Sequence, residues 1–268
     1  MSQASSAWML ARREWTRFFR QRNRVTAAIF QPLVFWILFG TGLRGAFESE
    51  GELNFMQFFL PGTIALVVLF TAIFATISVI EDRREGFLQS VLVSPVGRSS
   101  ILWGKVIGGS AIAWVEALIF VVLALVFGQI LPSLELVGGM ALLMVMAVAM
   151  CSLGMIVAWP MDSTQGFHAI MMLGLMPRWL LAGTFFPIPA WGSGASIGSS
   201  ALGLVMRANP LSYTMVELRR LMFPDAGAEA FAPSPIICWV VSFAFAAVVT
   251  VIALRLVHRP QKLDGALG

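Results

Sequence analysis

The chain has 268 residues, of which 58% are hydrophobic and 12% are charged, and its mean hydropathy is +0.84. The charged share is about half that of a soluble protein, and apolar runs of about 18 or more residues recur, so the composition excludes a soluble globular protein and predicts an integral membrane protein. The net charge of +4 does not indicate a nucleic-acid-binding protein, because six arginines crowd the segment before the first apolar run. Basic residues in that place set topology and attract anionic lipid.

The segment from Trp8 to Arg24 predicts an amphipathic helix lying on the membrane surface. At 100° per residue one side is an apolar stripe, made of Trp8, Ala11, Trp15, Phe18 and Phe19. The opposite side carries Arg13, Arg17, Arg20 and Arg24. The alternative is a plain topology anchor with no further role. A long span without a small-residue cleavage site follows, so we expect no signal peptide to be removed.

Six membrane-spanning helices follow in the prediction, and the fold class is an all-α polytopic membrane protein. They cover residues 25–43, 58–80, 101–127, 135–159, 164–186 and 235–257, each long enough for a hydrocarbon layer of about 30 Å. Pro32 and Pro177 fall inside spans and are expected to kink them. Residues 187–223 are too polar for a span and too apolar for a plain loop, which favours an outer re-entrant hairpin of short helices.

The distribution of basic residues predicts the orientation. Thirteen of the 18 lysines and arginines lie before the first span, around the segment 81–105, or after the last span. The positive-inside rule therefore places both termini and this segment in the cytoplasm, in a plasma (inner) membrane.

The segment from Glu81 to Arg98 is a charged, helix-forming interruption between two spans. One narrow apolar face is expected on it, from Phe87, Leu88, Val91 and Leu92, and Ser94-Pro95 should stop the helix. Ser99 or Ser100 is expected to cap the next span. The segment is either a lever that a partner protein moves or a solvated helix on the headgroups.

The motifs of a catalytic site are missing from the sequence. Gly104-Lys105 fails the phosphate-loop pattern, because Ser99 stands at the earlier glycine and Val106 follows the lysine. Cys151 and Cys238 lie in apolar segments and predict no disulfide, and His168 and His258 predict no metal site. We therefore expect no enzyme and no cofactor in this chain; any ATPase is a separate protein that docks on the cytoplasmic segment.

Two charges, Glu116 and Arg178, lie inside predicted spans at depths that differ by roughly one helical turn. Because an unpaired charge at mid-membrane costs at least about 2.5–3.5 kcal/mol, we expect them either to pair, within one subunit or across a dimer, or to face a wet pathway separately.

Three spaced motifs resemble the permeases of ABC transporters of the ABC-2 type. "EDRREGFLQSVLVSPVGRSSILWGK" (81–105) is similar to the family's loop between spans two and three, "LLAGTFFPIP" (180–189) to the end of its fifth span, and "NPLSYTMVELRRLMF" (209–223) to its second signature. Gln89 and Ser212 are mild departures, whereas Arg178 and the Gly/Ser-rich insert 192–200 bear on the substrate.

The resemblance implies a six-span half-transporter that pairs with a second permease copy and two ATP-binding subunits, which bind ATP and Mg. Its implied function is ATP-driven export of a hydrophobic, lipid-like, drug or lipid-linked glycan substrate. An ATPase-coupled membrane scaffold for assembly or mechanical work is the alternative. The implied ATPase-coupling residues are Glu81, Arg83, Arg84, Glu85, Gly86, Phe87, Leu88, Val91, Ser94, Pro95 and Arg98. The outer hairpin and pathway candidates are Glu116, Arg178, Asn209, Pro210, Tyr213, Glu217 and Arg219.

Overall fold

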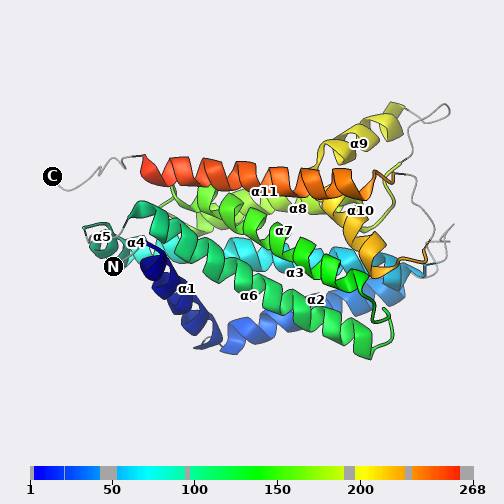
Figure 1. The fold of residues 1–268 in the computed structure, drawn as a ribbon, viewed down its shortest axis with the longest axis horizontal. Helices are drawn as coiled ribbons and strands as arrows, with labels where there is room; N and C mark the ends of the chain where they lie inside the picture. The colour runs from blue at the N-terminus through cyan, green and yellow to red at the C-terminus, as the bar shows by residue number, and fades with distance from the viewer. Residues whose placement is uncertain are drawn as a thin grey trace.

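The computed structural model describes residues 3–20, 22–42, 53–93, 97–189, 197–226 and 231–259, and all regular secondary structure in these ranges is helical (Figure 1). The helices are α1 (Gln3–Arg20), α2 (Arg22–Gly42), α3 (Phe55–Ala75), α4 (Ile77–Arg84), α5 (Phe87–Val93), α6 (Arg98–Val126), α7 (Glu135–Ala158), α8 (Thr164–Trp179), η1 (Leu180–Thr184), α9 (Ile197–Ala208), α10 (Pro210–Met222) and α11 (Pro235–His258).

Within the described ranges, four helical segments are long and apolar enough to cross a membrane: Phe55–Arg84, Arg98–Val126, Glu135–Ala158 and Pro235–His258. They match four of the six predicted spans. The other two predicted spans correspond to α2, whose apolar part is Pro32–Gly42, and to α8 with η1. The all-helical membrane fold is confirmed, and the count of six spans stays a prediction.

Helix α3 is the centre of the bundle, because 72% of its most apolar window is buried by its neighbours. Close approach to α6 and α7 depends on small residues. A Cβ on Gly109 of α6 would lie 2.5 Å from Cys151 Sγ of α7 and 2.9 Å from Ala75 Cβ of α3. The three helices therefore meet with almost no space between them at this level.

The two ends of the bundle differ in character (Figure 1). Helices α4 and α5, the start of α1 and the end of α11 lie at one end, and α9 and α10 lie at the other. Arg98 donates to the carbonyl oxygens of His258 and Arg259 (3.4 and 3.2 Å), which satisfies carbonyl groups at the end of α11. The predicted capping by Ser99 or Ser100 is wrong: α6 begins after Gly97 without a side-chain cap. Ser99 Oγ lies 3.1 Å from His258 Nε2, and Ser100 Oγ donates to the Gln3 carbonyl (3.0 Å).

Helix α8 changes its winding shortly after Pro177, where the π-helical turn η1 follows. Gly183 ends this turn with φ +83°, a conformation that only glycine adopts without strain. The Trp179 indole donates to the Gly62 carbonyl of α3 (2.9 Å), and Thr184 Oγ1 donates to the Trp179 carbonyl (2.8 Å). The start of the motif 180–189 thus forms a hydrogen-bonded corner beside α3.

Replacing Gly109 by leucine tests this packing. Gly109→Leu should lower the free energy of unfolding by about 1–3 kcal/mol, because Ala75 and Cys151 cannot make room without moving their helices. The measurement is unfolding by dodecyl sulfate in mixed micelles. Gly174→Leu on α8 is the matched control, since a Cβ there meets nothing within 4 Å. Equal stability of the two variants would contradict the packing described here.

Candidate functional site

Helix α1 packs directly on the first part of α6. A Cβ on Gly104 would lie 2.5 Å from Leu10 Cβ, and one on Gly108 would lie 3.0 Å from Glu14 Cβ, so the two backbones are nearly in contact. The buried positions of α1 are Ser6, Ala7, Ala11, Glu14 and Phe18. The predicted apolar stripe is therefore divided: Ala11 and Phe18 face the protein, whereas Trp8 and Phe19 are exposed. The helix also starts earlier than predicted and ends at Arg20, and Arg24 belongs to α2.

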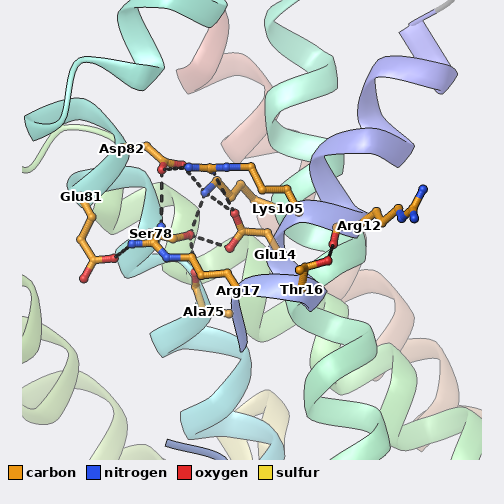
Figure 2. A network of polar contacts seen from close by, with 10 residues as sticks. Arg12, Glu14, Thr16, Arg17, Ala75, Ser78, Glu81, Asp82 and Lys105 are labelled. Carbon is orange, nitrogen blue, oxygen red and sulfur yellow. Dashed lines mark hydrogen bonds and ion pairs between the residues drawn. The ribbon is translucent and has the colours of Figure 1, made fainter. Parts of the chain in front are cut away.

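The contact between α1, α4 and α6 encloses a buried lysine (Figure 2). The Lys105 amino group donates to Glu14 Oε1 (2.7 Å), Ser78 Oγ (2.7 Å) and Asp82 Oδ2 (2.6 Å). An ammonium group has three N–H donors, and all three are used. Lys105, Glu14 and Asp82 are at most 6% exposed. Charges so well removed from water stay ionised only in such complementary surroundings.

Two arginines of α1 complete the network. Arg13 binds both oxygens of Asp82 (3.0 and 2.8 Å), the fork-shaped geometry that makes arginine–carboxylate pairs strong. Arg17 donates to Glu81 Oε2 (2.7 Å) and lies 3.5 Å from Asp82 Oδ1. The group named here the α1–α4–α6 charge network thus joins three cations to three carboxylates: Arg13, Arg17 and Lys105 with Glu14, Glu81 and Asp82.

The network fixes the start of the segment 81–105 to the rest of the bundle. Asp82 lies before α5 in the chain and Lys105 after it, so their ion pair closes the intervening loop while Arg13 holds it to α1. Sequence reasoning identified Glu81 but missed Glu14, Ser78, Asp82 and Lys105 as members of one site. Two features of the sequence could have identified the site. Lys105 lies seven residues into an apolar helix and therefore needs a partner, and Glu14 lies at helical spacing between Ala11 and Phe18, on the apolar side of its helix.

The turn from α4 into α5 depends on Gly86, which has φ +75°; a Cβ there would meet nothing within 4 Å, so the backbone conformation and not crowding requires glycine. The predicted apolar face of α5 turns inward. Leu88 is 3% exposed and belongs to the core, Val91 packs against that core, and the Phe87 ring lies under the Arg13 guanidinium at 3.9 Å. The exposed residues are Arg84, Glu85, Gln89 and Ser90. The exposed side chains that the structure describes on α4 and α5 are therefore polar; the side chain of Leu92, a member of the predicted face, and residues Ser94 and Pro95 lie outside the described part.

Arg83, another predicted coupling residue, points into the protein. Its guanidinium donates to the Met161 carbonyl (2.9 Å) and Asp162 (3.1 Å), and it also contacts the Trp159 carbonyl. These carbonyl and carboxylate groups directly follow the C-terminal end of α7, where the helix dipole favours a positive charge. Arg83 thus joins α4 to the α7–α8 connection, and Arg98 holds the end of α11 in a similar way.

The motif 209–223 builds helix α10 at the other end. Asn209 caps α10 by accepting from the Leu211 N–H (3.2 Å) and donates to the Arg178 carbonyl (2.7 Å), and Pro210 occupies the first turn. Tyr213 packs edge-on against Phe231 with ring centroids 5.6 Å apart. The motif connects α10 to the end of α8.

Two charged residues of α10 are buried. Arg219 donates to the Gly183 carbonyl (2.8 Å) and stacks on Phe58 of α3 at 3.9 Å. Glu217 pairs with Arg220, which also donates to the Pro233 carbonyl before α11 (2.8 Å). Charges at this end therefore hold α10 to η1, α3 and α11.

Glu116 and Arg178 are not brought together within the chain. Glu116 is 3% exposed on α6 and accepts a hydrogen bond from the Thr71 hydroxyl of α3. Arg178 is exposed on α8, and no described residue forms an ion pair with it. Pairing inside one subunit is thus not observed, which leaves pairing across two subunits or separate roles.

The charge network predicts a specific double-mutant result. Lys105→Met leaves two buried carboxylates short of a cation and should cost about 3–5 kcal/mol of stability. Asp82→Asn should also destabilise, and the double variant should lose less than the sum of the two single losses, by about 0.5–3 kcal/mol. Unfolding in mixed micelles measures all three, with exposed Arg84→Met as the control. Strict additivity would show that Lys105 and Asp82 do not interact.

Comparison with known proteins identifies the family. The family model for the ABC-2 type transporter matches residues 5–223, which include α1, the charge network and α10. A curated relative, "Putative transport permease ycf38" of Cyanophora paradoxa, is 34% identical over 99 residues, or 36% of this chain. The aligned part spans 34% of that relative's length. The chain belongs to the ABC-2 type transporter family of membrane transport proteins.

Proposed function

We propose that the chain is the permease subunit of an ATP-driven ABC exporter in the plasma (inner) membrane. Two separate ATP-binding subunits bind and hydrolyse ATP with Mg, and a second permease copy completes the membrane part. The substrate class is hydrophobic: a lipid-like molecule, a drug or a lipid-linked glycan. Membership of the ABC-2 family supports this proposal.

The observation that carries the proposal is the attachment of α4 and α5 to the rest of the bundle. The polar face of Arg84, Glu85, Gln89 and Ser90 is open to a partner. Behind it, Asp82 is bound to Lys105 of α6 and Arg13 of α1, and Arg83 is bound to the end of α7. A force on this face would reach three helices through charge-assisted hydrogen bonds.

The proposed topology has six spans, with both termini and α4–α5 in the cytoplasm and the segment 187–223 outside as a re-entrant hairpin. The positions of α4, α5 and the ends of α1 and α11 at one end of the bundle, opposite α9 and α10, support it (Figure 1). In this arrangement α2 and α8 with η1 are the first and fifth spans.

Arg178 supports a second copy or a pathway beside α8. Trp179 contacts Gly62, seven residues inside the start of α3, so Arg178 lies about 10 Å below that end of the bundle. An arginine facing lipid at such depth costs up to about 2.5–3.5 kcal/mol. We propose that a second permease or the substrate pathway covers this face.

Site-specific crosslinking tests the proposed docking surface. A photoreactive amino acid at Gln89, introduced into the full chain in its native cells, should capture an ATP-binding subunit, because Gln89 is exposed on α5. The same amino acid at Leu134, which is 84% exposed at the other end, should capture none. Mass spectrometry of the adducts identifies the partner. Capture of an ATP-binding protein at Leu134 and not at Gln89 would refute the proposed site and its orientation.

A further inference from the structure

Helix α1 has an exposed side that neither the charge network nor α6 uses. Trp8 is 67% exposed, and Met9 and Phe19 are each 50% exposed. Arg12 and Arg20 are exposed on the same side. At 100° per residue Trp8, Phe19 and Arg12 fall within about 40° of one another, and Met9 and Arg20 lie about 60–80° beyond Arg12, so the five residues share one face of the helix about 120° wide.

Two of the four arginines of α1 are bound to carboxylates and two are not. Arg13 and Arg17 are neutralised by Asp82 and Glu81 inside the molecule. Among the described residues, no carboxylate forms an ion pair with Arg12 or Arg20. Two positive charges therefore remain on the outer surface of a helix whose other cations are matched.

The position of α1 along α6 places this surface at the depth of the lipid headgroups. With 29 residues, α6 is about 43 Å long, roughly 13 Å more than the hydrocarbon layer. The extra length of α6 lies at the end that holds Arg98 and Lys105, because the other end exposes the apolar residues Val126 and Phe127, which suit the hydrocarbon layer. Gly104, where α1 crosses, is six residues or about 9 Å from the start of α6. Exposed Trp103 lies beside it, as expected for an interfacial aromatic belt.

We propose that this surface, made of Trp8, Met9, Arg12, Phe19 and Arg20, binds the headgroups of anionic phospholipids. The rings occupy the boundary between acyl chains and headgroups, and the two guanidinium groups bind phosphate oxygens. Since Glu14 of the charge network lies on the opposite side of α1 and Arg13 lies at the edge of this surface, the lipid holds α1 in the position in which the network ties it to α4 and α6. Anionic lipid is then a stabiliser of the coupling segment. This inference goes beyond the proposed function and does not depend on the identity of the ATPase or the substrate.

Native mass spectrometry of the purified full chain tests the proposal, with phosphatidylglycerol and phosphatidylcholine of identical acyl chains as probes. The wild type should prefer phosphatidylglycerol. Arg12→Gln/Arg20→Gln should weaken phosphatidylglycerol binding by about 10- to 30-fold, as expected for two surface arginines, and leave phosphatidylcholine binding unchanged. Arg255→Gln/Arg259→Gln is the matched control, because it removes two exposed arginines from the same end of the bundle. This control should keep most of the preference. No preference in the wild type, or an equal loss in both double variants, would overturn the proposal.

A second measurement distinguishes lipid from a protein partner on this surface. A photoreactive amino acid at Trp8 in native cells should form adducts with phospholipid. Adducts chiefly with an ATP-binding subunit would overturn the proposal, since the surface would then be a protein interface. A folding defect cannot mimic either result, because Trp8 is mostly exposed and its replacement leaves the α1–α6 contact intact.

Discussion

A lysine amino group that is buried seven residues into a membrane helix must be neutralised, and this constraint organises the end of the bundle at which α1, α4 and α6 meet. Lys105 meets it with Glu14 and Asp82, which come from two other helices. Asp82 accepts hydrogen bonds from Arg13 as well as from Lys105. Gly104 and Gly108 let α1 approach α6 closely enough for these bonds to form. Electrostatics and close packing thus require the same position of α1.

The arrangement separates a rigid base from an exposed surface. The apolar residues Leu88 and Val91 hold α5 on the bundle, and the exposed residues described on α4 and α5 are polar. Polar surfaces suit reversible docking, because the exposed state is stable in water. At the other end, Asn209 and Arg219 bind main-chain carbonyls of Arg178 and Gly183, so α10 is fixed to α8 and η1 in a comparable manner.

Local patterns allowed much of the fold to be predicted from the sequence. The span predicted at 101–127 is α6 at Arg98–Val126, and the span predicted at 135–159 is α7 at Glu135–Ala158. The partners of Lys105 could not be predicted, since Glu14 is 91 positions away and hydrophobic periodicity carries no information on which helices meet. The same limit applies to Leu88 and Val91 of α5: an amphipathic face predicts that something covers it, and the sequence does not show that these two residues pack on the chain's own core.

The charge network holds α1 against α4 and α6, and α5 follows α4 directly and contacts Arg13 through Phe87. The most direct measurement is the distance distribution between spin labels at Thr16 and Ser90, both exposed, in the full chain reconstituted in bilayers. The structure predicts a single narrow distribution in the wild type that broadens markedly in Lys105→Met. A distribution that is already broad in the wild type, or one that Lys105→Met leaves unchanged, would contradict the account.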